Sequence, residues 1–95
     1  MAEHIVMTDG WPGYWGRGQS EEEALKNFRA EGGRGKTLRV TFHEDYHDVR
    51  IDEMGHWTAH PKNPEVPHDQ RPYAIVTIDR VSANGRKRET VRDYR

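Results

Sequence analysis

The fold is decided by the stretch Thr37-Leu38-Arg39-Val40-Thr41-Phe42-His43, in which polar and apolar side chains alternate. The same alternation returns in residues 47–52, directly after the dipeptide Asp45-Tyr46. A period of two is typical of a β-strand with one buried face. If the dipeptide is a turn, the two strands pair with Phe42 opposite Val49, and apolar side chains meet on one face.

A second turn, Glu53-Met54-Gly55, follows this pair and has its glycine where a left-handed conformation is needed. The register across the turn sets Val49 opposite Ala59 and Ile51 opposite Trp57. The chain from residue 37 to residue 60 therefore predicts a three-stranded antiparallel meander.

Strand and turn signals extend on both sides of the meander. Residues 4–8 form a short apolar segment that predicts a first strand, and residues 73–81 form the most apolar strand, which we expect at the centre of the sheet. The dipeptide Asn84-Gly85 is a strong hairpin signal and predicts a polar edge strand over residues 86–94. The predicted cross-strand pairs are Val91 with Ile78 and Glu89 with Arg80.

One helix is predicted between these strands. Ser20 is a good N-cap, Glu23 completes a Ser-x-x-Glu capping box, and Gly32-Gly33 ends the helix. Residues 61–72 hold four prolines, which predicts an exposed connection. Together these signals predict a single small α+β domain over residues 1–95, with one helix packed on an antiparallel sheet or meander of about five to seven strands.

The composition predicts a small core and excludes several classes of chemistry. Apolar residues make up 33% of the chain, and seven valines and four isoleucines against two leucines favour sheet. The absence of cysteine excludes disulfides, thiolate zinc sites and cysteine nucleophiles. Residues 1–4 lack the features of a signal peptide, and no stretch approaches the roughly 20 apolar residues of a membrane span. We therefore expect a cytoplasmic protein with no membrane partner.

Residues 12–25 carry the pattern Pro-Gly-x-x-x-x-Gly-Gln-Ser-x-Glu-Glu-Ala-Leu. This pattern resembles that of HicB-like antitoxins, P-G-C-x-x-x-G-D-T-x-E-E-A-L, with identical spacing. HicB-like antitoxins bind a toxin and an operator, so the resemblance implies a protein partner and a DNA partner. The run from Gly13 to Gly18 before a capped helix also resembles small proteins of phages and plasmids, which implies an origin in a mobile element.

The formal net charge of −1 conceals a basic C-terminal segment. Residues 80–95 hold six Lys or Arg against two acids, and the predicted hairpin places its arginines on one face. Such a stripe predicts contact with the phosphates of DNA or RNA, whereas the alternative is an edge strand that is charged to prevent aggregation. The candidate nucleic-acid-binding residues are Arg86, Arg88, Arg92, Arg34 and Lys36, with Arg17 nearby.

Three large aromatic residues lie within five positions, beside glycines: Trp11, Tyr14 and Trp15. Together with Arg17 they form a candidate protein-binding surface. The alternative is that they cover a small core, and alternation sends Tyr14 and Trp15 to opposite faces, so both interpretations can hold.

The six histidines raise the question of a metal site. In the predicted meander Asp48 lies between His43 and His60, and imidazole and carboxylate are both suitable ligands for a divalent metal. Arg39 and Asp52 extend the same polar face, so the interpretation we favour is a solvent-facing ladder of paired charges. We predict neither a metal nor a cofactor.

The sequence favours a binding protein over an enzyme. The segment 43–47 has acids and histidines but no nucleophile to pair with them. The glycine-rich segment 32–36 leaves a helix and enters a strand, which is the reverse of a phosphate-binding P-loop. We therefore expect a small non-enzymatic binding or regulatory protein, a protein-interaction module in the first place and a nucleic-acid-binding protein as the alternative. A homodimer through an exposed sheet edge also stays open.

Overall fold

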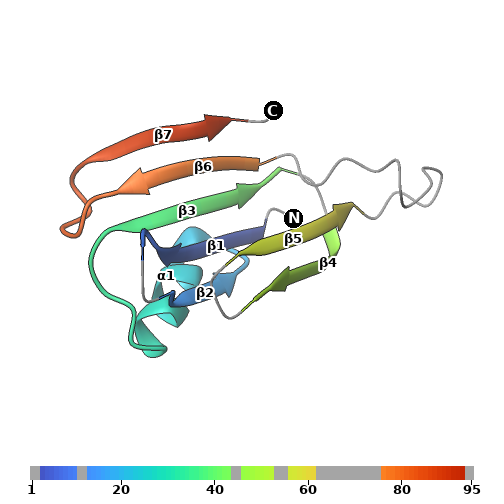
Figure 1. The fold of residues 1–95 in the computed structure, drawn as a ribbon, viewed down its shortest axis with the longest axis horizontal. Coiled ribbons are helices and arrows are strands. Elements are labelled where there is room, and N and C mark those ends of the chain that lie inside the picture. The colour runs from blue at the N-terminus through green and yellow to red at the C-terminus, as the bar shows by residue number, and fades with distance from the viewer. Residues whose placement is uncertain (1–2, 11–12, 44–45, 53–55, 62–75, 94–95) are drawn as a thin grey trace.

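The computed structural model describes residues 3–10, 13–43, 46–52, 56–61 and 76–93. Within them lie one helix and seven strands, in an α+β arrangement that confirms the predicted fold class (Figure 1). The elements are β1 (Glu3–Thr8), β2 (Trp15–Gly18), α1 (Glu21–Ala30), β3 (Thr37–Phe42), β4 (Tyr46–Ile51), β5 (Trp57–Pro61), β6 (Val76–Val81) and β7 (Arg88–Asp93).

The helix begins and ends where its capping residues predict. The Ser20 hydroxyl accepts a hydrogen bond from the Glu23 backbone N–H at 3.1 Å. At the other end the Gly32 N–H donates to the Arg29 carbonyl, and the Gly33 N–H donates to the Phe28 carbonyl. Gly32 has a φ of +101°, so these bonds form a glycine-dependent C-cap of the Schellman type.

The main sheet has five antiparallel strands in the order β2-β1-β3-β6-β7, and a separate two-stranded sheet holds β4 and β5. The predicted pairing of Phe42 with Val49 is therefore wrong, because β3 pairs with β1 on one side and β6 on the other. It is β3, and not the strand that ends at Val81, that occupies the centre. Alternation in residues 37–43 predicts a strand with two distinct faces but does not identify its neighbours.

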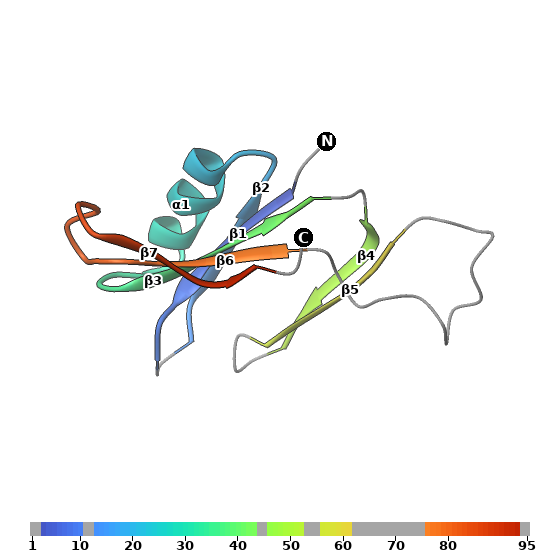
Figure 2. The ribbon, with the colours of Figure 1, turned by 90° about the horizontal axis from the view of Figure 1, so that it is seen from above.

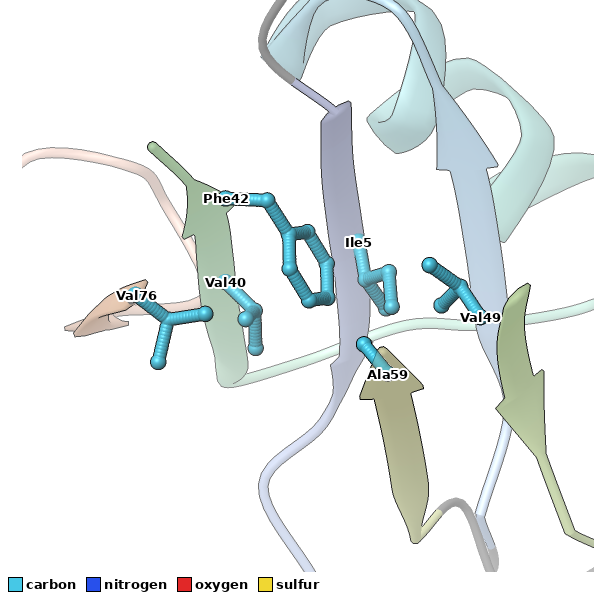
Figure 3. Packing of buried hydrophobic residues seen from close by; sticks show 6 residues of the cluster. All are labelled: Ile5, Val40, Phe42, Val49, Ala59 and Val76. Carbon is cyan, nitrogen blue, oxygen red and sulfur yellow. The ribbon is translucent and has the colours of Figure 1, made fainter. Parts of the chain in front are cut away.

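The β4–β5 hairpin has the predicted register, with Val49 opposite Ala59 and Ile51 opposite Trp57. Figure 2 shows that this hairpin and α1 lie on opposite sides of the main sheet. On the hairpin side, one buried cluster joins side chains of both sheets (Figure 3). Its buried members are Ile5, Val40, Phe42, Val49, Ala59 and Val76.

On the other side, α1 packs on β1 and β2. Val6 of the sheet meets Ala24 and Phe28 of the helix, and all three are buried. Gly16 permits this close approach, because a Cβ at that position would lie 2.1 Å from the Phe28 backbone nitrogen. The helix covers the half of this face that is formed by β1 and β2. It does not cover the half formed by β6 and β7, where the side chains are polar.

The β6–β7 hairpin confirms the predicted pair of Arg80 with Glu89, and β7 lies at the edge of the sheet as expected. The predicted pair of Val91 with Ile78 is wrong, because the register shifts and Arg92 stands opposite Ile78. A bulge of this kind adds one residue to a strand and reverses the faces of the residues that follow it.

Some predictions fall outside the described residues: the proline-rich connection beyond Pro61, the turn at 53–55, Trp11, and the start of the strand predicted from residue 73. None of the described helices is long and apolar enough to cross a membrane.

Candidate nucleic-acid interface

Cations gather at one end of the main sheet. The connection from α1 to β3 and the turn from β6 to β7 lie at this end in both views (Figures 1 and 2). The turn is closed by a hydrogen bond from the Gly85 N–H to the Ser82 carbonyl at 2.9 Å. We call this region the basic end, and its cations are Arg29, Arg34, Lys36, Arg39, Arg80, Arg86, Lys87 and Arg88.

A cavity of about 370 Å³ opens at the basic end, between α1 and the β6–β7 turn. Its lining contains the four arginines Arg29, Arg34, Arg39 and Arg88 and a single acid, Glu21. The apolar residues of the same lining are the half-buried Leu25 and the buried Phe28 and Val81. We call it the arginine cavity.

Two of these arginines share the acid. The Arg88 guanidinium binds both carboxylate oxygens of Glu21, Nη2 to Oε1 at 2.6 Å and Nη1 to Oε2 at 3.0 Å. Arg39 Nη1 donates to Glu21 Oε2 at 3.2 Å. The hydrogen bond from Arg88 holds the pKa of Glu21 below its ordinary value of 4.5, with the charges of both arginines adding to the effect. The same pairing raises the pKa of Arg88 above its ordinary value.

A second carboxylate also accepts a hydrogen bond from Arg88. Asp79 on the neighbouring strand accepts from Arg88 Nε at 2.8 Å, and its other oxygen accepts from the Thr90 hydroxyl at 2.9 Å. Arg39 has a similar support, since its Nε donates to the buried Thr37 hydroxyl at 3.1 Å. Two guanidinium groups and two carboxylates therefore form a rigid cluster with no net charge.

The other two arginines of the cavity have no such neutralisation. Arg34 Nη1 donates only to backbone carbonyls, those of Gly33 at 2.6 Å and Arg29 at 3.2 Å. The Arg29 side chain makes no ion pair within the described part of the chain. The arginine cavity therefore carries a formal charge of about +2, which comes from these two side chains.

A smaller cavity of about 310 Å³ adjoins the basic end. It is lined by Lys36, Lys87 and Arg88, with Arg80 and Glu89 beside them. Arg80 is neutralised, since it contacts Asp9 at 2.9 Å and Glu89 at 3.1 Å. Lys36 and Lys87 make no ion pair with any residue that the structure describes. Arg88 lines both cavities, but Arg80 and Glu89 lie on the opposite face of the sheet from Val81, so the two cavities lie at the same end of the sheet and not on one face.

The structure brings together most of the residues predicted to bind nucleic acid, but not all of them. Arg34 and Arg88 line the arginine cavity, and Lys36 lines its neighbour. Arg86 lies in the exposed turn between them. Arg92 lines neither cavity, because the bulge in β7 places it opposite Ile78, on the other face of the sheet from Arg88.

Arg17, predicted near the basic stripe and also as a protein contact, has a structural role. It donates from Nη1 to the Val49 carbonyl at 3.0 Å and pairs with Glu3. This residue therefore ties the edge strand β2 to the β4–β5 hairpin, away from the basic end.

Of the three aromatic residues predicted to bind a protein, Tyr14 and Trp15 lie in the described part of the chain, and both line a separate cavity of about 370 Å³. Tyr14 is 40% exposed and Trp15 is 36% exposed, and the lining also includes Asn27 of α1 and its C-cap residue Glu31. The two rings lie on opposite faces as predicted: Tyr14 lies next to Gly32 of the helix end, and Trp15 pairs with Met7 on the hairpin side.

The predicted row of metal ligands is divided between the two sheets. The backbone register does set Asp48 opposite His60. His43, however, follows β3 and binds the Thr77 hydroxyl through Nε2 at 2.6 Å, because β3 and β4 do not pair. Arg39 likewise meets Glu21 instead of Asp52. No group of three or more potential ligands stands together among the described residues.

The region of the sheet beyond α1 holds a row of hydroxyl and imidazole groups. His4 Nδ1 lies 3.4 Å from the Thr41 hydroxyl, and the Thr77 hydroxyl donates to Asp93 at 3.4 Å. Burial is the largest effect on His4 and lowers its pKa below the ordinary 6.5. This row continues the polar surface from the basic end toward the opposite end of the sheet.

Sequence reasoning missed Arg29, Arg39 and Glu21. Arg29 is one of several charged residues of an amphipathic helix, and the sequence does not distinguish it from the others. Arg39 was predicted to share a polar face with Asp52, in a pair of strands that does not form. The acidic first turn of α1, Glu21 to Glu23, is visible in the sequence, but negative charge there is favoured by the helix dipole in any helix and does not identify an arginine partner. Comparison with models of known families, with curated proteins and with solved structures finds no match to this chain, so the function has to be argued from its own residues.

Proposed function

We propose that this chain is a small non-enzymatic binding protein that holds the phosphates of DNA or RNA on its basic end. The observation that carries the proposal is the convergence of cations from separate segments at one end of the sheet, around two cavities that share Arg88: Arg29 of α1, Arg34 and Lys36 of the connection that follows, and Lys87 of the β6–β7 turn. None of these four has an acidic partner in the described part of the chain. Unpaired cations close to one another are what contact with a phosphate backbone requires.

The rigidity of the surface supports the same function. The Arg88–Glu21–Arg39 cluster links β7, α1 and β3 by hydrogen bonds of 2.6–3.2 Å. The helix and strands that flank the cations are therefore held together, which reduces the entropy lost on binding. The chain has no cysteine and needs no oxidising compartment, which fits a protein that works in the cytoplasm.

The test is the salt dependence of binding to single-stranded DNA and RNA, measured by fluorescence anisotropy. We expect affinity to fall steeply between about 50 and 200 mM salt, with a log–log slope that reports the number of neutralised phosphates. Replacing Lys36 and Lys87 together with Gln should lower the slope by about two. Arg92→Gln removes a charge that lines neither cavity and should leave the slope unchanged. Absence of binding at 50 mM salt would refute the proposal.

A protein-interaction surface is the second candidate, because Tyr14 and Trp15 are exposed beside a cavity of about 370 Å³. Aromatic side chains around a concave site are typical of interface hot spots. This candidate predicts that Trp15→Ala leaves the protein folded and nucleic-acid affinity intact, but abolishes capture of a protein partner from nuclease-treated lysate. The resemblance of residues 12–25 to HicB-like antitoxins supports the same expectation.

A further inference from the structure

We infer that the arginine cavity is a site for a phosphomonoester, the terminal phosphate of a nucleotide, as distinct from the diester phosphates of a continuous strand. The inference rests on the proposed function when the phosphomonoester is the 5′ end of a nucleic acid, and goes beyond it when the ligand is a free nucleotide.

Charge balance is the first argument. Glu21 and Asp79 already neutralise Arg39 and Arg88, so the +2 that remains comes from Arg29 and Arg34. A phosphomonoester carries about −1.5 to −2 at pH 7, whereas each internal diester carries about −1. A monoester therefore matches the unneutralised charge of the cavity in a single group.

The geometry of the arginines is the second argument. A guanidinium group offers five N–H donors in a planar fork that suits two phosphate oxygens at once. Arg34 uses Nη1 to hold the carbonyls of Gly33 and Arg29, which fixes the plane of the group and leaves its other nitrogens available to a ligand. Arg29 has all five donors available within the described residues.

The size and lining of the cavity indicate a ligand that is larger than inorganic phosphate. About 370 Å³ lies within the range of about 300–1,000 Å³ that is typical of small-molecule sites. Leu25 is half-buried and is the apolar residue of the lining with accessible surface, whereas Phe28 and Val81 also belong to the lining but are only 1% and 2% exposed. An apolar surface next to two free guanidinium groups fits a nucleoside attached to its phosphate.

The same arrangement gives Glu21 a second role. Its carboxylate occupies the donors of Arg39 and Arg88 that would otherwise add to the phosphate site. Glu21→Gln should therefore raise the charge of the cavity and tighten phosphomonoester binding, even though the variant is less stable.

The experiment compares two 3′-fluorescein-labelled single-stranded DNA oligonucleotides, one with a 5′ phosphate and one with a 5′ hydroxyl, at 50 mM salt. We expect the 5′ phosphate to bind about tenfold more tightly, which corresponds to one additional charge-assisted contact. Arg29→Gln should abolish the preference, and because Arg29 makes no internal ion pair this variant should fold normally. The matched control Arg92→Gln should keep the full preference.

A parallel NMR titration with AMP and with adenosine distinguishes the two sources of the ligand. AMP that shifts the amides of residues 34–37 and 81–85, while adenosine does not, supports the inference even if no oligonucleotide binds, and the proposed function alone then fails. Equal affinity for the two oligonucleotides, with no response to AMP, overturns the inference and leaves the proposed function standing. No binding of any probe overturns both, and the arginines then serve only to cap the helix and join the strands.

Discussion

Glu21→Gln is the substitution that tests the cluster at the basic end most sharply. Three hydrogen bonds from two arginines reach this carboxylate, at 2.6, 3.0 and 3.2 Å. A well-shielded charge-assisted hydrogen bond contributes about 1.5–3 kcal/mol, whereas an exposed ion pair contributes about 0.2–1 kcal/mol. The Glu21 side chain is 29% exposed, Arg39 12% and Arg88 44%, so the cluster lies between these limits. We expect a loss of about 1–2 kcal/mol in the free energy of unfolding at pH 7.

The neighbouring residue provides a matched control. Glu22 also lies in the first turn of α1, is exposed, and makes no ion pair with a described residue. Glu22→Gln therefore removes the same charge from the same end of the helix dipole and should cost no more than about 0.5 kcal/mol. Urea denaturation followed by tryptophan fluorescence measures both variants. Equal losses in the two variants would refute the claim that Glu21 organises this surface.

The pH dependence gives the prediction a second readout. Because the pKa of Glu21 is lowered in the folded protein, its contribution is complete above the ordinary value of 4.5 and is lost as pH falls through the folded pKa. The stability difference between wild type and Glu21→Gln should therefore be smaller at pH 3 than at pH 7. A difference that does not change with pH would contradict the ionic origin of the effect.

Three further predictions concern the fold that carries this surface. Gly16→Ala should cost about 3 kcal/mol in thermal unfolding, because its Cβ would meet the Phe28 backbone at 2.1 Å. Trp57→Ala should cost about 2–3 kcal/mol in urea, since its ring meets Phe42 edge to face at 5.3 Å, and Trp57→Phe should recover most of the loss. His4 binds its proton less readily when folded, so stability should fall as pH drops below 6.5, and by less in His4→Gln. A wild-type slope equal to that of the variant would contradict the burial of His4.

Local signals in the sequence predicted the elements whose partners are close along the chain. Ser20 and Gly32 bound the helix because capping depends on the next few residues only. The register of Val49 with Ala59 followed from a short turn between alternating strands. Each of these features could be predicted because the same segment supplies both the donor and the acceptor, or both strands of the pair.

Features that depend on distant segments could not be predicted in the same way. Alternation in β3 is equally compatible with β4 or with β1 and β6 as neighbours, and packing of the whole core decides between them. The candidate site could not be predicted for the same reason, because its residues come from distant segments. Arg39 meets Glu21 only because β3 is central and α1 lies beside it. The bulge that places Arg92 on the other face of the sheet from Arg88 cannot be recognised from composition or alternation.

The most direct measurement of the central claim is the map of amide chemical-shift changes in the labelled protein on titration with a 5′-phosphorylated single-stranded oligonucleotide at 50 mM salt. We predict that the changes concentrate in residues 29–39 and 82–88 and disappear as salt is raised. Changes centred instead on residues 14–17 of the aromatic edge, or no changes at all, would contradict the assignment of phosphate binding to the basic end.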